Sequence, residues 1–189
     1  MMTVSNQTII ACWIIFIAYW AISAVGIKRA VERESRVSGL KYKAPLTLGS
    51  MLLWCSNLLH QMNPLLIPHR DLAGAISAVV CVFGLLVAIW SRRTLAGNWS
   101  SSVTFKQGHE LIQRGPYRLA RHPIYTGILL MCAGTAIGVG RLFSWLGLLI
   151  LSAGFWIKLK QEESLLLRHF PGDYPSYRTR VKALVPFVI

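Results

Sequence analysis

Five apolar blocks separated by polar connections account for most of this 189-residue chain. An α-helix rises about 1.5 Å per residue, so about 20 apolar residues cross a hydrocarbon core of about 30 Å. The blocks therefore predict an all-α integral membrane protein with about five transmembrane helices in a single membrane domain, residues 1–189. The expected spans are residues 8–27, 45–67, 72–95, 123–138 and 142–159.

The second block is less apolar than the others in its C-terminal half. Asn, His, Gln and Pro side chains gather there, at positions 57, 60, 61, 63 and 64. In lipid such groups must face protein or a cavity. We expect Pro64 and Pro68 to end the helix near the far side of the membrane. A structural polar cluster is the favoured interpretation of His60, and a functional role for it stays open.

The last two blocks predict a helical hairpin. Pro123 suits the first turn of a helix, where its missing N–H has no partner to lose. The tight turn over residues 138–141 then forces the two helices into an antiparallel pair. The pair returns the chain to its starting side, so it brings residues 109–125 close to residues 158–163. A short amphipathic helix around residues 165–170 is expected next, stopped by Pro171 and Gly172.

Basic residues predict the orientation in the membrane. With five spans, the N-terminus, the 68–71 connection and the 139–141 turn lie on one side, where Arg70 and Arg141 are the basic residues. The other side carries the rest of the 20 Lys and Arg residues. The positive-inside rule then places the N-terminus outside and the C-terminus in the cytoplasm. The first ten residues contain no basic residue, so we expect the first block to be a retained span.

Composition supports a membrane protein over a nucleic-acid binder. Hydrophobic residues make up 54% and charged residues 14%, against about 25% charged residues in soluble domains. The net charge of +13 comes from short basic patches between apolar blocks, which suits anionic lipid headgroups, and we expect no nucleic-acid partner. The cysteines lie in apolar runs without metal-ligand spacing, so neither a metal site nor a disulfide is expected: Cys12, Cys55, Cys81 and Cys132.

One polar stretch, residues 109–127 (HELIQRGPYRLARHPIYTG), concentrates the candidate chemistry. A pocket at the expected start of the fourth helix would suit a polar small molecule of mixed charge, and the helix N-terminus favours an anionic group. Its expected ring is Arg121, His122, Tyr125, Glu162 and Glu163. Simpler interpretations stay open. The arginines could be membrane anchors, the glutamates a solvated helix end, and the tyrosines interfacial residues.

The runs GPYRLARHPIYTG (115–127), EE (162–163) and FPGDYPSYRTRV (170–181) resemble the isoprenylcysteine carboxyl methyltransferase family. These integral-membrane enzymes use S-adenosylmethionine and are related to phospholipid N-methyltransferases. The resemblance covers about residues 98–186. Pro171 is an extra residue relative to the family's pattern, so the register is least secure there.

The resemblance implies a cytoplasmic cofactor pocket formed by segments 98–125 and 158–189. It assigns the cofactor to His109, Glu110, Leu111 and Ile112, chiefly through backbone atoms, with Tyr117 beside it. His122, Pro123, Ile124 and Tyr125 would line the pocket, and Glu162, or Glu163 one register later, would bind the polar end. The family has an arginine that contacts the substrate carboxylate where this chain has Lys158, and lysine lacks the bidentate fork. Lys158 and Arg121 are the expected substrate-binding residues.

The resemblance therefore implies methyl transfer from S-adenosylmethionine, giving S-adenosylhomocysteine, to a lipid or prenylated acceptor such as an isoprenylcysteine-like carboxylate. An ionised carboxylate needs no general base and the transfer needs no metal, so no catalytic residue is assigned. Three alternatives stay open. They are a phospholipid amine or small thiol as acceptor, an NADPH-dependent enzyme like the sterol reductases, and a non-enzymatic scaffold that binds anionic lipid.

Overall fold

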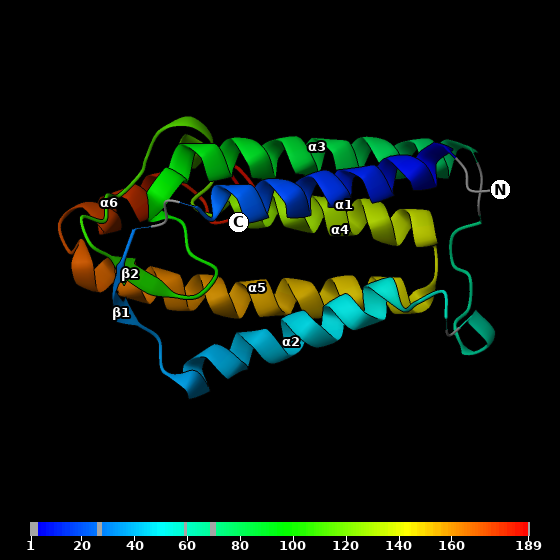
Figure 1. Cartoon of the computed structure of the whole chain (residues 1–189), viewed down its shortest axis with the longest axis horizontal. Helices are drawn as coiled ribbons and strands as arrows, with labels where there is room; N and C mark the ends of the chain where they lie inside the picture. The colour runs from blue at the N-terminus through cyan, green and yellow to red at the C-terminus, as the bar shows by residue number, and fades with distance from the viewer. Residues whose placement is uncertain (1–3, 26–27, 59, 69–70, 189) are drawn as a thin grey trace.

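The computed structural model describes residues 4–25, 28–58, 60–68 and 71–188. The longer helices of this part of the chain lie roughly along one direction, and a short helix and a small sheet lie at one end (Figure 1). The α-helices are α1 Val4–Ser23, α2 Arg36–Trp54, α3 Asp71–Leu95, α4 Pro123–Val139, α5 Leu142–His169 and α6 Asp173–Arg180. The protein is therefore mainly helical, as the apolar blocks predict.

Three stretches in the described part of the chain are long and apolar enough to cross a membrane: Val4–Ser23, Asp71–Asn98 and Leu142–His169. Helix α4 is equally apolar but shorter, with 17 residues. A membrane protein is confirmed at this level, and α2 falls outside these criteria. Arg70, on which part of the predicted orientation depends, lies outside the described residues.

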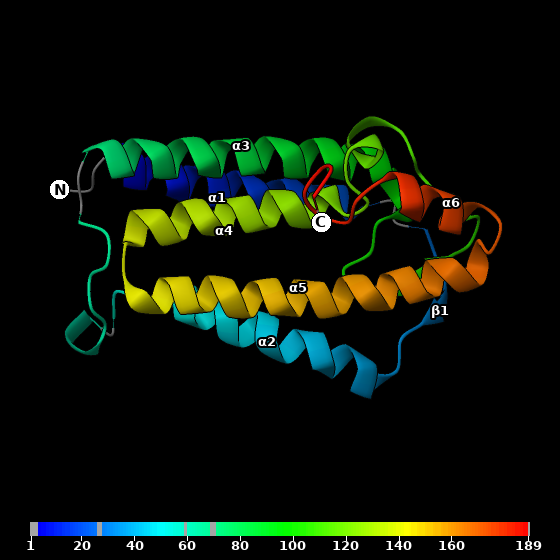
Figure 2. The same cartoon turned by 180° about the vertical axis from the view of Figure 1, so that it is seen from behind.

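Glycines let the helices pack in close pairs. Gly84 of α3 faces Gly127 of α4 so closely that a Cβ atom at Gly84 would lie 2.6 Å from the Gly127 carbonyl oxygen. Gly49 of α2 and Gly147 of α5 meet in the same way. Small residues at such crossings allow backbones to approach, as in other membrane helix pairs. The bundle is therefore built from the pairs α3–α4 and α2–α5, with α1 against α3 (Figure 2).

The second predicted span, 45–67, is wrong in its bounds, because α2 runs from Arg36 to Trp54. The helix begins early because the Ser35 side chain accepts a hydrogen bond from the Ser38 N–H, and it continues through Pro45. Beyond Trp54 the chain forms turns and a 3₁₀ segment, His60–Met62. Pro64 therefore lies beyond the helix and does not end it.

The polar residues after α2 hold the turn between α4 and α5. Asn63 is buried, and its amide donates to the Ser56 carbonyl and hydroxyl oxygens at 2.8 Å. Its side-chain oxygen accepts from the Phe143 N–H at 2.8 Å, and its carbonyl accepts from Arg141 at 2.7 Å. Asn63, Ser56 and Arg141 therefore form a structural polar cluster. The His60 side chain lies outside what the structure describes.

The remaining predicted bounds agree more closely with the helices. Helix α1 begins before and ends before the predicted span 8–27, and residues 26–27 lie outside the described part. Helices α3 and α4 match residues 72–95 and 123–138 to within one residue. Gly140, at φ +68°, ends α4, and α5 then runs the opposite way (Figure 2). Helix α5 extends to His169, so the short helix expected around residues 165–170 is part of α5.

A two-stranded antiparallel sheet departs from the all-α expectation. Strand β1, Ala30–Arg33, pairs with β2, Thr104–Lys106, with Ala30 opposite Lys106 and Arg33 opposite Thr104. Strands this short carry no readable alternation in the sequence. The sheet joins the connection after α1 to the connection after α3, which forms one wall of the site described next.

Candidate functional site

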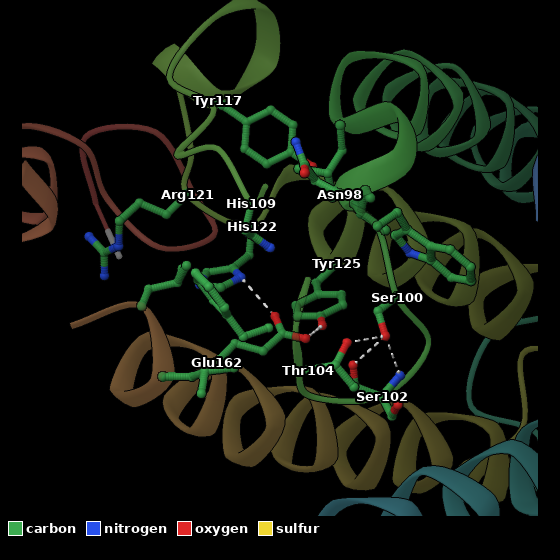
Figure 3. Close-up of a pocket in the computed structure, with 16 residues that line it drawn as sticks. Asn98, Ser100, Ser102, Thr104, His109, Tyr117, Arg121, His122, Tyr125 and Glu162 are labelled. Atoms are coloured by element: carbon green, nitrogen blue, oxygen red, sulfur yellow. Dashed lines mark hydrogen bonds and ion pairs between the residues drawn. The ribbon is translucent and has the colours of Figure 1, made fainter. Parts of the chain in front are cut away.

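A pocket lies at the end of the bundle where α4 begins and the last turns of α5 pass beside it (Figure 3). Aromatic, hydroxyl and charged side chains share its lining. They are Leu95, Asn98, Trp99, Ser100, Ser102, Thr104, Phe105, His109, Tyr117, Arg121, His122, Ile124, Tyr125, Glu162, Leu165 and Leu166. Residues 98–109 form one wall, the start of α4 forms a second, and α5 forms the third.

Glu162 is the residue on which the polar contacts of the α4 side converge. The Tyr125 hydroxyl donates to Glu162 Oε1 at 2.6 Å. His122 Nδ1 lies 3.5 Å from Glu162 Oε2 (Figure 3). His122 precedes Pro123 at the start of α4, and Tyr125 follows within the first turn. The proline-initiated helix therefore directs both side chains toward one carboxylate of α5.

His122 lies between two carboxylates. Its side chain is 7% exposed, and its Nε2 atom lies 3.6 Å from Glu163 Oε1 on the side away from Glu162. Burial alone lowers the pKa of an imidazole, but the nearby carboxylates of Glu162 and Glu163 outweigh burial and raise the pKa of His122 above its usual value. His122 is therefore suited to hold a proton between the two glutamates.

Arg121 and Glu163 form a buried ion pair that ties down the C-terminal segment. Arg121 Nε and Nη2 lie 2.8 and 2.6 Å from Glu163 Oε1, and the two side chains are 8% and 3% exposed. Arg121 Nη1 donates to the carbonyls of Arg178 and Val181. In Figure 3 the Arg121 side chain points away from Glu162 and Tyr125. Its donors are therefore largely engaged by protein acceptors.

The C-terminal segment returns to the start of α4. The Arg121 and His122 N–H groups donate to the carbonyls of Lys182 and Ala183 at 2.8 and 2.9 Å. The Thr126 hydroxyl donates to the Leu184 carbonyl at 2.7 Å. The predicted cofactor segment 158–189 is therefore brought to the predicted segment 98–125 by backbone pairing.

A smaller cavity adjoins the pocket and shares His109, Tyr117 and Arg121 with it. Its other lining residues include Glu110, Leu111 and Ile112, with Tyr174 and Tyr177 from α6. The Tyr177 hydroxyl donates to the Tyr117 carbonyl at 2.6 Å, which holds α6 against this wall. His109 therefore lines both cavities, and the next three residues, Glu110 to Ile112, line the smaller one.

Stacked rings form the outer wall. The His109 ring lies 4.9 Å from the Phe105 ring at 18°, and the His169 ring lies 3.6 Å from Phe105 at 10°. Glu32 of β1 contacts His169 Nε2 at 2.7 Å and fixes the far end of this stack. Burial, together with Lys28 and Lys106, lowers the pKa of His109 to about 4. His109 is therefore neutral near pH 7.

The N-terminal part of the chain backs the 98–109 wall. The Lys28 ammonium donates to the Asn98 side-chain oxygen at 3.0 Å and to the Gly108 carbonyl at 2.6 Å. The Glu34 N–H donates to the Val103 carbonyl at 3.1 Å. The pairing of β1 with β2 completes the attachment. This wall is therefore positioned by residues 28–34, about 70 residues earlier in sequence.

The structure brings most of the predicted site residues together. His109, Tyr117, His122, Ile124, Tyr125, Arg121 and Glu162 line the main pocket, and Glu110, Leu111 and Ile112 line the adjoining cavity. Pro123, Glu163 and Lys158 line neither. Pro123 begins α4, Glu163 pairs with Arg121, and Lys158 donates to the Ser101 carbonyl at 2.7 Å.

Several lining residues were not singled out from the sequence. They are Leu95, Asn98, Trp99, Ser100, Ser102, Thr104, Phe105, Leu165, Leu166, Tyr174 and Tyr177. The segment 98–125 was predicted to bind the cofactor as a whole, but its first residues carry no motif that separates a pocket wall from a polar loop. Within the described residues, no group of three or more His, Cys, Asp or Glu side chains is arranged to hold a metal ion.

Comparison with known proteins identifies the family. The model of a family described as phospholipid methyltransferase matches residues 72–173, more than half of the chain. The chain belongs to this phospholipid methyltransferase family. The matched range contains α3 except its first residue, all of α4, every residue that lines the main pocket, and both Glu162 and Glu163 of α5.

Individual relatives agree with the resemblance to isoprenylcysteine carboxyl methyltransferases, which is confirmed. A probable protein-S-isoprenylcysteine O-methyltransferase of Oryza sativa subsp. indica is 32% identical over 87 residues, 46% of each chain. Protein-S-isoprenylcysteine O-methyltransferase B of Arabidopsis thaliana is 31% identical over 84 residues, 44% of this chain and 43% of its own. The Saccharomyces cerevisiae enzyme is 25% identical over 123 residues, 62% and 50%. The chain thus spans about half the length of these relatives.

Proposed function

We propose that this protein transfers a methyl group from S-adenosylmethionine to a lipophilic acceptor, the carboxylate of an isoprenylcysteine-like lipid. The observation that carries the proposal is the convergence of Tyr125 and His122 on Glu162 in a pocket lined with aromatic rings. This pocket lies within the range that the family model matches. The relatives named protein-S-isoprenylcysteine O-methyltransferase support the acceptor.

The lining fits the chemical parts of S-adenosylmethionine. A carboxylate at Glu162 suits its ammonium group, and the rings of Phe105 and His109 suit the flat adenine. The Nδ1 atom of His109 is buried without a hydrogen-bond partner in the described structure, which leaves it available to a ligand. Leu111 and Ile112 add apolar surface and backbone groups beside it. We propose these residues, with Glu110, Tyr117, His122, Ile124 and Tyr125, as the cofactor-binding set. Pro123 and Glu163 line neither cavity and would support the set from behind, Pro123 by starting α4 and Glu163 by pairing with Arg121.

Apolar side chains on the membrane side of the pocket suit an isoprenyl chain. Tyr125 contacts Phe155 with ring centroids 4.9 Å apart, and both belong to a core cluster that includes Leu159. Trp20, Leu46 and Leu129 pack against the same cluster. We propose that the lipid approaches through this apolar region while the cofactor arrives from the aqueous side. The resemblance predicts Arg121 and Lys158 as substrate-binding residues, and the Lys158 ammonium donates to the Ser101 carbonyl at 2.7 Å.

Five crossings fit this arrangement, with the N-terminus outside and the C-terminus cytoplasmic. Helices α2 and α4 would then add two crossings to the three stretches that are long and apolar enough to span a membrane. Helices α4 and α5 would form the predicted hairpin. Helix α6 and strands β1 and β2 lie at one end of the bundle (Figure 1), and residues of β2 and of the connections beside it line the pocket. That end would face the cytoplasm, where S-adenosylmethionine and anionic headgroups are found.

The proposed reaction needs little acid–base catalysis from the protein. When bound, the cofactor supplies an electrophilic methyl group on a sulfonium. A carboxylic acid acceptor is ionised near pH 7 and has no proton to lose. The residues of this chain would hold the two reactants in line and exclude water from their meeting point. Glu162 would hold charge opposite the cofactor's ammonium, with Tyr125 and His122 fixing its orientation.

A phospholipid amine is the second candidate acceptor, because the matching family is described as phospholipid methyltransferase. An ammonium acceptor must lose a proton before it can attack a methyl group. The Tyr125–Glu162–His122 cluster contains groups able to receive that proton. The amine acceptor therefore predicts a rate that rises with pH, whereas the carboxylate acceptor predicts a rate nearly independent of pH around neutrality.

A methyl-acceptor assay tests the choice. Purified protein in detergent would receive labelled S-adenosylmethionine with N-acetyl-farnesylcysteine or, separately, with phosphatidylethanolamine. Label should appear in a base-labile methyl ester of the farnesylcysteine. Label confined to phosphatidylethanolamine would replace the carboxylate with the amine, and no label in either would contradict both acceptors.

A further inference from the structure

The ammonium of Lys158 lies in an enclosed setting behind the pocket. The side chain is 8% exposed, and Lys158 is absent from the residues that line either cavity. Its Nζ atom donates to the Ser101 carbonyl at 2.7 Å and lies 3.9 Å from Glu162 Oε1. The Lys158 ammonium thus contacts both Glu162 and the 98–109 wall.

Two tyrosine rings enclose the same ammonium. Lys158 Nζ lies 5.5 Å from the centroid of the Tyr42 ring and 5.3 Å from that of the Tyr125 ring. An ammonium within about 6 Å of an aromatic face is attracted to the ring, more strongly when it is removed from water. Together with Ser101 and Glu162, these rings occupy the surroundings in which an acceptor's carboxylate would have to lie.

Tyr42 connects this ammonium to the N-terminal half of the chain. Tyr42 is 1% exposed, and its hydroxyl donates to Glu34 Oε1 at 2.5 Å. The Glu34 N–H in turn donates to the Val103 carbonyl at 3.1 Å. The segment from Ser101 to Val103 is therefore held at one end by Lys158 and at the other by Glu34.

The held segment is part of the pocket wall. Ser102 lines the pocket directly, as do Ser100 and Thr104 on either side of the segment. The Ser100 hydroxyl donates to the Ser102 carbonyl at 2.7 Å and accepts from the Thr104 hydroxyl at 2.8 Å. This wall has no regular structure between Asn98 and β2, so its shape depends on such side-chain contacts.

We propose that Lys158 is a positioning residue: it fixes the Ser101 wall and Glu162 relative to each other, and it does not bind the acceptor's carboxylate. The inference rests on the proposed function and deepens it, because it changes which residues select the acceptor. Tyr42, which lies outside the range matched by the family model, takes part in the same positioning.

The experiment compares Lys158→Met, Lys158→Arg and Tyr42→Leu with wild-type protein. Lys160→Met is the matched control, since Lys160 lies on the same helix over the Trp156 ring, outside both cavities. Four quantities are measured in detergent: the Kd for S-adenosylhomocysteine, the KM and the kcat with N-acetyl-farnesylcysteine, and inhibition by its carboxamide, which lacks the negative charge.

A positioning role predicts a loss in cofactor binding and turnover. Lys158→Met should weaken S-adenosylhomocysteine binding about tenfold, as expected for lost hydrogen bonds to a charged group. The KM for the carboxylate and its preference over the carboxamide should stay within about threefold of wild type. Tyr42→Leu should act in the same direction, and the double variant should lose less than the product of the two single losses. Lys160→Met should match wild type.

The opposite pattern would overturn the inference. If Lys158 clamps the acceptor, Lys158→Met raises the KM about tenfold and abolishes the preference over the carboxamide, while S-adenosylhomocysteine binding is unchanged. Lys158→Arg would then lower the KM, because the guanidinium can bind a carboxylate in a bidentate manner. Should Lys158→Met fail to fold, the KM of Lys158→Arg and the Kd of Tyr42→Leu decide. Wild-type protein that binds no S-adenosylhomocysteine would contradict the proposed function itself.

Discussion

The Tyr125 hydroxyl and Glu162 Oε1 are 2.6 Å apart, although the two residues are separated by 37 positions in the chain. Tyr125 lies in the first turn of α4, and Glu162 lies about two turns before the end of α5. The contact therefore depends on both helices and on the Gly140 turn that joins them. It links the fold of the bundle directly to the chemistry of the pocket.

Tyr125→Phe removes this hydrogen bond and keeps the ring. We expect binding of S-adenosylhomocysteine to weaken about fivefold, because a hydrogen bond to a charged group contributes about 1 kcal/mol or more. Calorimetric titration in detergent measures the change. Tyr19→Phe is the control, since Tyr19 lies on α1, away from the pocket lining. Equal affinities for the two variants would remove Tyr125 from the cofactor's surroundings.

His122 should make stability depend on pH on the alkaline side. Its pKa is raised in the folded protein, because Glu162 and Glu163 outweigh the opposing effect of burial. The folded state therefore keeps a proton that the unfolded chain releases above about pH 6.5. This contribution is complete below that pH and is lost as the pH rises through the folded pKa.

His122→Asn removes the titration. Thermal unfolding in detergent, followed from about pH 6 to about pH 9, should show wild-type protein losing its advantage over the variant as the pH rises. A difference in Tm that stays constant across this range would contradict a raised pKa for His122.

His109 should make stability depend on pH on the acidic side, where stability falls as the pH falls. Its pKa is lowered to about 4, mainly by burial. Between about pH 6.5 and about pH 4 the His109 imidazole is protonated in the unfolded chain and stays neutral in the folded protein. Stability therefore falls as the pH falls. His109→Phe keeps a ring against Phe105 and removes the titration. The variant should lose less stability than wild type on acidification, and parallel curves would contradict this account.

The Arg121–Glu163 pair should hold the C-terminal segment to the start of α4. Arg121→Ala leaves a buried carboxylate without its main partner, and we expect a loss of about 3 kcal/mol in unfolding free energy. Arg118→Ala, at an exposed position, should cost far less. The double variant with Arg121→Leu and Glu163→Leu should be more stable than Arg121→Leu alone.

Protease sensitivity provides a second measure of the same contact. The segment after Val181 should be cut faster in Arg121→Ala than in wild type, since Arg121 donates to the Arg178 and Val181 carbonyls. If Arg121→Ala is cut at the wild-type rate and is as stable as the Arg118→Ala control, backbone pairing alone holds this segment.

Apolar helices and a proline-initiated site were predictable because their signals are local. The bounds of α3 and α4 follow from apolar runs and from Pro123, and the α4–α5 turn follows from Gly140. His122 and Glu162 meet because a short turn brings the chain back. The start of α2 was missed because its N-cap at Ser35 lies in a polar stretch, where no apolar run marks the beginning of a helix.

The shape of the 98–109 wall could not be predicted from the sequence. Its shape depends on Lys28, Glu32 and Glu34, which reach it across about 70 residues. Nothing local to Ser100 or Thr104 indicates that they line a pocket, because serines and threonines are also typical of loops. Likewise, Lys158 was expected to face the substrate, and only the tertiary contact with Ser101 shows that its ammonium is already bound.

The central claim is that the pocket around Glu162 binds S-adenosylmethionine, and titration with its product tests this most directly. Detergent-purified protein would be titrated by calorimetry with S-adenosylhomocysteine and, separately, with NADPH. We expect wild-type protein to bind S-adenosylhomocysteine, and Glu162→Ala and His122→Ala to bind it at least about tenfold more weakly, which corresponds to about 1.4 kcal/mol. Binding of NADPH in place of S-adenosylhomocysteine, or unchanged affinity in both folded variants, would contradict the claim.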